Sequence, residues 1–288
     1  MVEKHTSFIV TGPTASGKSE YAHRLAREHN GVIINCDSVQ IYSGIENISA
    51  SPFAGRTVSD EIDGVPYRLF SILPLSAQIS VADYLQMARR EYDAALASGR
   101  TPIFVGGTGY YMNAIINGIS PMPEISHENR ARAREMVASD LGAARKMLPP
   151  EFTATDPQRV ARAVEVFLET GCHLTEWQKS PRSGAITPTP YKILINPDMS
   201  ELRPRIAARI PKMVAGGALD EARAIIAANW DASRAIGAAQ LCAYLRGEIS
   251  RDDCVAMWIT KTNQYAKRQR TWFRTQFVAD LEINHAIK

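Results

Sequence analysis

The sequence has few cysteines and none of the spacings that bind a metal. Its four cysteines form no C-x-x-C pair, and its six histidines are scattered without the H-E-x-x-H spacing of a metal site. Cys36 ends an apolar segment, where a buried thiol is commoner than a reactive one. This cysteine usage is typical of a reduced protein, so we expect a cytoplasmic location.

Long apolar runs are absent as well. No segment approaches the roughly 20 apolar residues that cross a membrane, and no signal peptide precedes the first apolar segment. We therefore expect no membrane contact. With 45% hydrophobic residues in a chain of 288, there are enough apolar side chains for the core of one large domain or two smaller ones.

Acidic residues are scarce toward the C-terminal end. Residues 201–288 contain 14 Lys and Arg against 9 Asp and Glu, and residues 254–279 contain no acid at all. That stretch interleaves cations with aromatic residues, a pattern that suits a phosphodiester backbone with exposed bases. The alternative is a solvated helix face whose aromatic side chains pack inward.

The most informative motif follows a short apolar segment, residues 7–11. It reads G-x-x-x-x-G-K-S and consists of Gly12, Pro13, Thr14, Ala15, Ser16, Gly17, Lys18 and Ser19. An amphipathic helix follows, and in that setting consecutive backbone N–H groups and the positive end of the helix form an anion site. Lys18 would reach the outer phosphates, and the Ser19 hydroxyl would ligate Mg²⁺. The motif therefore predicts a loop that binds a phosphate or a diphosphate.

The strand-end acid that P-loop hydrolases use is missing from its usual place. The strongest later strand, residues 101–105, runs into Gly106-Gly107-Thr108-Gly109 without a carboxylate. The first acid at a strand end is Asp37, after the apolar residues 32–36. One carboxylate and one hydroxyl thus converge on the phosphate loop, which favours group transfer over ATP hydrolysis.

The order of segments predicts an α/β fold, in which a parallel P-loop sheet is flanked by helices. Residues 1–120 would form the first part of the core, with a strand at 67–73 after an acidic turn at 60–64. Residues 121–190 change to helices with proline-rich joints and read as a helical insertion. Residues 191–288 would complete the core with a strand at 191–195, and the rest would be helical at 201–214, 219–228, 237–245 and 252–277.

Six sequence blocks occur in a specific order over nearly the whole chain. They are G-P-T-A-S-G-K-S at 12–19, D-S-x-Q-x-Y at 37–42, V-G-G-T-G-x-Y at 105–111, D-P-Q-R-x-x-R-A-x-E-V at 156–166, R-A-I-G at 234–237 and Y-A-K-R-Q-x-T-W at 265–272. In these blocks the chain resembles the tRNA dimethylallyltransferases, also called tRNA isopentenyltransferases. We expect a bacterial type, because the zinc-finger extension of eukaryotic relatives is not found.

The resemblance implies a reaction and the residues that perform it. Dimethylallyl diphosphate would donate its prenyl group to N6 of the adenosine 3′ to a tRNA anticodon, and diphosphate would leave. The P-loop, Arg234 and Mg²⁺ at Ser19 would take up the charge that develops as the allylic C–O bond breaks. Asp37 matches the family's general base, and Thr108 matches the residue that hydrogen-bonds near the bridging oxygen. Their ordinary alternatives are a turn-capping Asp and a strand-end Thr.

The resemblance also implies a tRNA-binding surface. The acceptor adenine has to leave the stack of the anticodon loop, and the residues that would read it are Asp37, Ser38, Val39 and Gln40. Gln40 suits an adenine edge because an amide both donates and accepts. Further tRNA contacts are implied for Arg130, Gln158, Arg159, Val160, Ala161, Arg162, Lys267, Arg268 and Arg270. Ordinary helix salt bridges, such as Arg162 with Glu165, are the alternative. The expected partners are the anticodon stem-loop and dimethylallyl diphosphate, bound by a monomer.

The chain departs from the family pattern at three places. Residues 48–52 replace a lysine-bearing G-T-A-K-P, Ala238-Ala239-Gln240 replaces an aromatic-basic-acid trio, and Asn263 replaces an Arg. None of these positions touches Asp37, Thr108 or the P-loop, so we expect an active enzyme with altered tRNA affinity.

Other functions share some of these features. A P-loop metabolite kinase would share the fold and Mg²⁺, and the arginines of the insertion could form the lid that it needs over ATP. An adenylate isopentenyltransferase would prenylate free nucleotides, whereas the basic C-terminal helix favours a polymeric acceptor. A non-enzymatic RNA-binding protein is disfavoured by the pair of Asp37 and Thr108.

Overall fold

The computed structural model describes residues 6–287, and the chain divides into two compact units. One unit combines Met1–Ile116 with Ile186–Lys288, and the other is Asn117–Ala185. The second unit is therefore inserted into the first. Within residues 6–287, no helix is long and apolar enough to cross a membrane.

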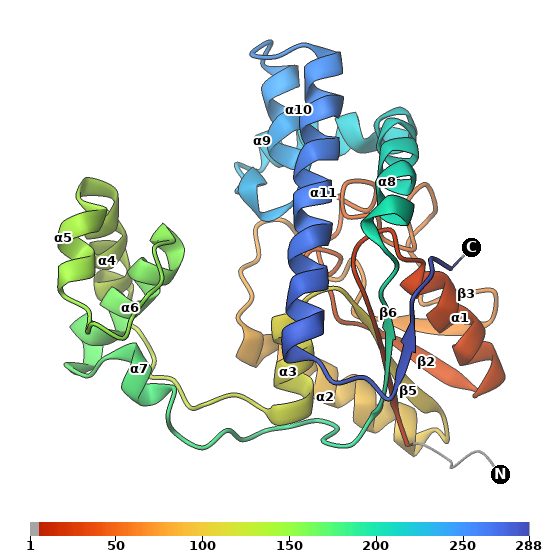
Figure 1. Cartoon of the computed structure of the whole chain (residues 1–288), viewed down its shortest axis with the longest axis horizontal. Helices are drawn as coiled ribbons and strands as arrows, with labels where there is room; N and C mark the ends of the chain where they lie inside the picture. The colour runs from red at the N-terminus through yellow and green to blue at the C-terminus, as the bar shows by residue number, and fades with distance from the viewer. Residues whose placement is uncertain (1–5, 288) are drawn as a thin grey trace. The chain divides into compact units, whose positions relative to one another are not determined.

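The first unit is built on a seven-stranded sheet with the order β3-β4-β2-β5-β1-β6-β7 (Figure 1). The strands are β1 (Phe8–Thr11), β2 (Gly31–Asn35), β3 (Glu61–Ile62), β4 (Val65–Arg68), β5 (Thr101–Gly106), β6 (Tyr191–Ile195) and β7 (Leu281–Ile283). All neighbours are parallel except β3 and β4. The expected α/β fold is confirmed, and the segments after β1, β2 and β5 emerge at one edge of the sheet, where open parallel sheets bind ligands.

Helices cover both faces of this sheet, which explains why its central strands are buried along nearly their whole length and are mainly apolar. On one face Val10 and Ile103 belong to the same buried cluster as Leu25 of α1. On the other face Phe104 stacks on Tyr92 of α2, with ring centroids 6.1 Å apart. The helices of the first unit are α1 (Lys18–Glu28), α2 (Val81–Ala97), α3 (Gly109–Asn117), α8 (Met199–Met213), the π turn η1 (Val214–Ala218), α9 (Leu219–Ala227), the 3-10 turn η2 (Ala232–Arg234), α10 (Ala238–Leu245) and α11 (Arg251–Gln276).

The region after β2 differs from the strand expected at 67–73. The strand there is the shorter β4, and it ends where Leu69 enters the left-handed region with φ 64°. The turn expected at 60–64 also contributes the two residues of β3, and Asp63-Gly64 makes the reversal with φ of 48° and 78°. A hairpin this short carries no alternating pattern, so only its turn was evident from sequence.

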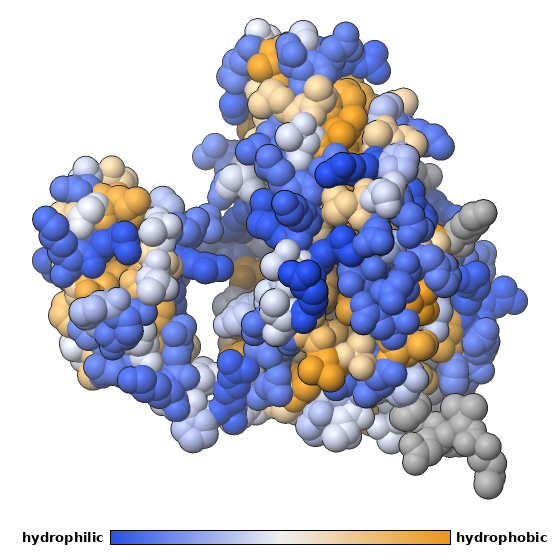
Figure 2. Space-filling view, viewed as in Figure 1, coloured by the Kyte–Doolittle hydropathy of each residue, from blue (hydrophilic) through white to orange (hydrophobic). Residues whose placement is uncertain are grey.

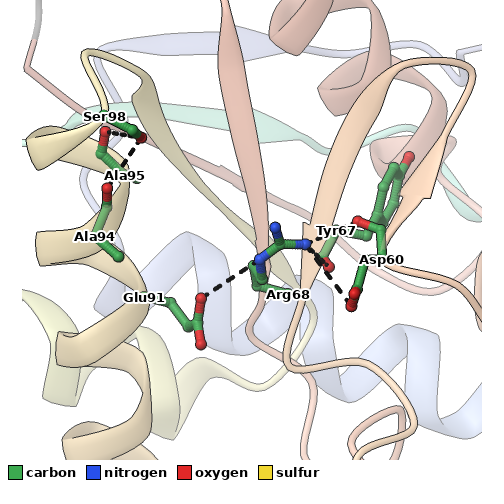
Figure 3. Close-up of polar contacts among 7 residues, drawn as sticks. All are labelled: Asp60, Tyr67, Arg68, Glu91, Ala94, Ala95 and Ser98. Atoms are coloured by element: carbon green, nitrogen blue, oxygen red, sulfur yellow. Dashed lines mark hydrogen bonds and ion pairs between the residues drawn. The ribbon is translucent and has the colours of Figure 1, made fainter.

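Arg68 connects this hairpin to the neighbouring helix, as Figure 3 shows. Its guanidinium donates to the backbone oxygen of Asp60 at 2.8 Å and lies 3.6 Å from the carboxylate of Glu91 on α2. At the end of α2 the Ser98 hydroxyl hydrogen-bonds to the backbone oxygens of the preceding turn. These contacts stabilise the sheet edge opposite β7.

The four helices expected after residue 200 are confirmed, each within two residues at either end. In Figure 1 the long α11 lies beside α8 and α10, which both pack against it. The expectation that this part is helical throughout is wrong at β7, which pairs with β6 at the sheet edge. Two of the three β7 residues are exposed, so the segment has no apolar run to reveal it.

The second unit consists of α4 (His127–Ser139), α5 (Leu141–Lys146), α6 (Pro157–Thr170) and α7 (Leu174–Trp177). Asp156 caps α6 by accepting from Arg159 N, and Gly171 ends it in the left-handed conformation, as the sequence indicated. The unit begins and ends a few residues earlier than the expected 121–190. Its chain ends pair with each other through Ile119 and Ser183, whereas Ile186 already hydrogen-bonds within the first unit.

Candidate active site

A cavity of about 800 Å³ opens at the carboxyl edge of the sheet in the first unit. It is lined by P-loop residues 14–15 and 17–20, residues 37–40, residues 48–50, six residues of α8, residues 234–236, and Trp258, Thr262, Tyr265 and Gln269 of α11. One end of the cavity is formed by the P-loop and by lysine and arginine side chains, and much of the remaining wall is apolar. The sequence motifs at 12–19, 37–42 and 234–237 therefore meet in one place.

The P-loop has the backbone geometry of an anion site. Gly17 precedes α1 with φ 90° and caps it with no side-chain hydrogen bond, so the first N–H groups of the helix point to the cavity end unpaired by a cap. Gly12 cannot carry a side chain, because a Cβ there would lie 2.1 Å from the backbone oxygen of Ile195. Gln269 of α11 accepts from Thr14 N at 2.8 Å and fixes the tip of the loop.

Several cationic side chains lie at this loop. Burial lowers the pKa of Lys18 to about 8, against the charge of Asp37, which raises it. Burial, followed by the charge of Arg205, lowers the pKa of Arg209 to about 10. Arg209 donates to the Thr14 hydroxyl at 2.8 Å, and its buried Nε has no partner among residues 6–287. In that part of the chain no carboxylate forms an ion pair with either arginine, so the site is prepared for a bound anion.

Arg234, which the resemblance assigns to the diphosphate, also lines the cavity. Its side chain is 41% exposed and its Nε lies 3.9 Å from the Asp231 carboxylate, so the pair is loose. A guanidinium held this weakly remains available to an anion in the cavity.

Asp37 follows β2 and lines the cavity beside Lys18. Its Oδ1 accepts from Val39 N at 3.0 Å, so the turn-capping interpretation is correct for that oxygen. No hydrogen bond among the described residues engages Oδ2. Burial, and then the charge of Asp37, raise the pKa of Tyr265, which faces the same space. The adjacent Cys36 is fully buried and its thiol pKa is raised by burial, which confirms the unreactive interpretation.

Thr108 lies behind Ser38 rather than on the cavity wall. Its hydroxyl oxygen accepts from Ser38 N at 3.1 Å, and the hydroxyl donates to Ser38 Oγ at 3.3 Å. Ser38 itself lines the cavity. In this conformation Thr108 supports the residue next to Asp37, and its contact with a bridging oxygen stays a prediction.

Gln40 lines the cavity, but its amide nitrogen is already occupied. Nε2 donates to the backbone oxygens of Ser49 and Ala50, both at 3.1 Å. Because the two N–H bonds are used, only Oε1 can serve a base in the cavity. In this conformation the Gln40 amide nitrogen is therefore not free to donate, and the expected contact of Gln40 with an adenine edge stays a prediction.

Comparison with known proteins identifies the family. The model of the IPP transferase family matches residues 40–276, and the isopentenyl transferase model matches residues 5–69. The chain is 38% identical over 291 residues to the tRNA dimethylallyltransferase of Paramagnetospirillum magneticum, covering 97% of this chain and 91% of the relative. The chain belongs to the tRNA dimethylallyltransferase family. Its identity to the tRNA dimethylallyltransferase of Acidiphilium cryptum is 39%, covering 97% and 87%.

Solved structures agree with this assignment. The tRNA isopentenylpyrophosphate transferase of Bacillus halodurans is 29% identical with a TM-score of 0.68, covering 98% of this chain and 90% of that one. A eukaryotic dimethylallyltransferase, described as acting on tRNA, is 22% identical with a TM-score of 0.78, covering 98% and 74%, and shares the fold. The resemblance based on the six blocks is confirmed. The alternatives of a metabolite kinase and of a non-enzymatic RNA-binding protein are set aside.

The cations predicted on α11 fall into two classes in this family member. Lys267 and Arg268 are exposed and border a shallow groove with Trp272. Figure 2 shows a largely hydrophilic surface on the side of the molecule where α11 lies. Arg270 instead donates to Asp198 at 2.8 Å and to Asn196 at 3.2 Å. Both contacts tie α11 to the segment after β6, and the assignment of Arg270 to tRNA stays a prediction.

The aromatic residues of α11 support the alternative of inward packing. Trp258 and Phe273 are buried, at 2% and 0% exposure. Trp272 is half-buried and covers Gly109, where a Cβ would meet its ring at 2.6 Å. The interleaved aromatics are thus largely core, and the basic residues between them form the exposed face.

In the second unit the predicted tRNA residues also divide. Gln158 and Arg159 are exposed at the start of α6. Arg130 and Arg162 both lie near the Glu165 carboxylate, at 3.5 and 3.6 Å, as the salt-bridge alternative expected. Val160 is fully buried in the core of the unit, so its side chain cannot reach an RNA, and that prediction is wrong.

The polar residues of the cavity wall that sequence reasoning missed include Arg205, Arg209, Lys212 and Gln269. The first three recur along α8 at helical spacing, which indicates one shared face but not what that face meets. Gln269 is 6% exposed on an otherwise basic helix, and it joins Thr14 N to the backbone oxygen of Gly107, to which its amide donates at 3.0 Å. The only sign of Gln269 in the sequence was an uncharged amide between Arg268 and Arg270.

Proposed function

We propose that this chain transfers the dimethylallyl group of dimethylallyl diphosphate to N6 of the adenosine 3′ to a tRNA anticodon, releasing diphosphate. One observation carries the proposal: a helix end without a side-chain cap, the partly unsatisfied guanidinium of Arg209 and a strand-end carboxylate share a single cavity. The first part suits a diphosphate, and the second suits the nucleophile that displaces it.

The donor would lie with its diphosphate at the P-loop. Lys18, Arg209 and Arg234 provide cations there, and Lys18 is largely protonated at neutral pH because its pKa is about 8. As the C–O bond breaks, its electron pair passes to the diphosphate, and these groups stabilise the growing negative charge. They need little rearrangement, since Gln269 and Thr14 already fix the loop and Arg209.

Mg²⁺ would be held by the Ser19 hydroxyl and by oxygens of the diphosphate. Ser19 lines the cavity at the start of α1, and none of the described residues hydrogen-bonds to its hydroxyl. The described residues contain no cluster of three acidic, His or Cys side chains that could hold a metal alone. This fits an ion that is bound mainly by phosphate and water, and when bound it would supply further charge neutralisation.

The apolar wall would receive the prenyl group. Ile48, Ile210, Met213, Ile236 and Trp258 line the cavity beyond the cations. An allylic carbon that develops positive charge is easily captured by water, so an apolar lining protects the transfer.

Asp37 would act as the base toward the acceptor adenine. In one displacement the N6–C bond forms, the C–O bond breaks, and the N6 proton passes to the Asp37 carboxylate. Oδ1 remains bonded to Val39 N, which holds the carboxylate in place, and Oδ2 takes the proton. Gln40 Oε1 is positioned to accept from the adenine edge.

The tRNA backbone would contact the exposed cations of both units. On α11 these are Lys267 and Arg268, and on α6 the exposed Arg159 with Gln158. Phosphate contacts orient the tRNA, while the cavity residues select the base.

The test is a transfer assay with competing acceptors and anions. With labelled dimethylallyl diphosphate, label should move to tRNA and not to AMP, and inorganic pyrophosphate should inhibit more strongly than ATP. Transfer to AMP would favour an adenylate isopentenyltransferase. Phosphate transfer from ATP would overturn the proposal.

A further inference from the structure

We propose that Glu221 is a positioning residue for the acceptor base. Its carboxylate fixes residues 46–51, here termed the acceptor loop, and that loop in turn holds Gln40. This inference rests on the proposed function, because it assigns the adenine to the part of the cavity that Gln40 lines.

Glu221 receives three hydrogen bonds from two consecutive residues of the loop. Oε1 accepts from Asn47 N at 2.7 Å and from Asn47 Nδ2 at 2.8 Å, and Oε2 accepts from Ile48 N at 2.7 Å. Both carboxylate oxygens are engaged in a half-buried setting. The loop is therefore attached to α9 through groups more than 170 residues away in sequence.

The bulge at η1 lets α9 come this close. Gly217 in η1 has φ 116°, and a Cβ at this position would lie 3.3 Å from Asn47 Nδ2. A side chain there would be strained and would crowd the contact between Asn47 and Glu221.

The loop needs such support because it is not relaxed. Ala50 has φ 52°, a left-handed conformation that a non-glycine residue adopts only when its surroundings impose it. Internal hydrogen bonds from Ala50 N to Asn47 O and from Ser51 N to Glu46 O close the turn. This conformation points the Ser49 and Ala50 oxygens at Gln40 Nε2.

Glu221 is connected to the cavity through this chain of contacts. Ile48, Ser49, Ala50 and Gln40 line the cavity, and Glu221 does not. Loss of the Glu221 carboxylate would let the loop move and would release the Gln40 amide. Gln40 Oε1 would then no longer be held in a fixed position to accept a hydrogen bond from the adenine. The donor end of the cavity, formed by the P-loop and α8, shares none of these hydrogen bonds.

The test is Glu221→Gln, measured by steady-state kinetics for both substrates. The new NH₂ group faces loop N–H donors, so we expect kcat/KM for tRNA to fall about 10- to 100-fold, as for buried donors left unpaired. The KM for dimethylallyl diphosphate should change less than twofold. The control is Asp220→Asn, whose carboxylate is 81% exposed and pairs with Arg223, and it should match the wild type.

A second measurement separates positioning from a general structural role. In a Gln40→Ala background, Glu221→Gln should lower kcat/KM for tRNA less than threefold, because the residue through which it acts is gone. An equal fall in both backgrounds, or equal losses toward both substrates, would overturn the proposal. If Glu221→Gln lowers the melting temperature sharply, Asn47→Ala serves as the second variant, because it removes only the Nδ2 contact with Glu221. It should lower kcat/KM for tRNA a few-fold and leave the KM for dimethylallyl diphosphate unchanged. An unchanged kcat/KM for tRNA would contradict the proposal. A wild-type enzyme inactive on tRNA would instead refute the proposed function itself.

Discussion

Arg209 offers the sharpest test of the diphosphate site, because no sequence motif pointed to it. Its guanidinium donates to the Thr14 hydroxyl, its buried Nε lacks a partner among residues 6–287, and its pKa is lowered to about 10 by burial and then by Arg205. A group in this state gains from an anion that supplies the missing acceptor. We expect Arg209→Gln to weaken binding of pyrophosphate and dimethylallyl diphosphate.

The magnitude follows from the contacts. A hydrogen bond to a charged partner is worth about 1.5–3 kcal/mol, which corresponds to a loss of about 10- to 150-fold in affinity. The stability of the free protein should rise or stay unchanged, because the substitution removes a buried positive charge. That charge lies beside Arg205, and in the wild type it lowers the pKa of Lys18.

The assay is calorimetric titration with pyrophosphate, combined with thermal unfolding of the free protein. The matched control is Arg203→Gln, an exposed arginine on the same helix that does not line the cavity. Arg203→Gln should leave the affinity unchanged. Unaltered pyrophosphate affinity in Arg209→Gln, or a fall in stability without a fall in affinity, would refute the reasoning.

Three further predictions concern the base, the pH dependence and the RNA surface. Asp37→Asn should lower single-turnover transfer by about 10²–10⁴ with little effect on binding, and a near-normal rate would remove Asp37 from the chemistry. Because the pKa of Lys18 is lowered to about 8, pyrophosphate affinity should decline as pH rises through that value while the ammonium deprotonates, and Lys18→Met should abolish the decline. Lys267→Ala with Arg268→Ala should reduce the slope of log tRNA affinity against log salt by about two, whereas Arg270→Ala should mainly lower stability by removing the contacts with Asp198 and Asn196.

Features encoded in a continuous segment were predictable from sequence. The P-loop needs only its own backbone and the helix that follows it, so its eight residues indicated an anion site directly. Long helices with a regular apolar face, such as α11, were placed within two residues for the same reason.

Features that depend on distant packing were not predictable. Arg209 reaches Thr14 across 195 positions of sequence through the packing of the folded unit, and periodicity cannot show which polar residue meets a cavity. Gln40 has its amide occupied by a loop that Glu221 holds from α9. Val160 belongs to the same sequence block as Arg159 and Arg162, but its position on the helix places its side chain in the core of the second unit.

The edge strands β3 and β7 were not predicted from sequence for a different reason. β3 and β7 have two and three residues and are partly exposed, so neither contains enough apolar positions to give a pattern. Their pairing is set by the strand already beside them rather than by their own sequence.

The central claim is that the cation-lined end of the cavity and Asp37 serve one transfer to a tRNA adenine. The most direct measurement is a single turnover with labelled dimethylallyl diphosphate and an anticodon stem-loop, followed by digestion to nucleosides. Label should appear on N6 of the adenosine 3′ to the anticodon, with one diphosphate released, and it should be lost when that adenosine is replaced by guanosine. Label on another nucleoside, or diphosphate release with the prenyl group passing to water alone, would contradict the claim.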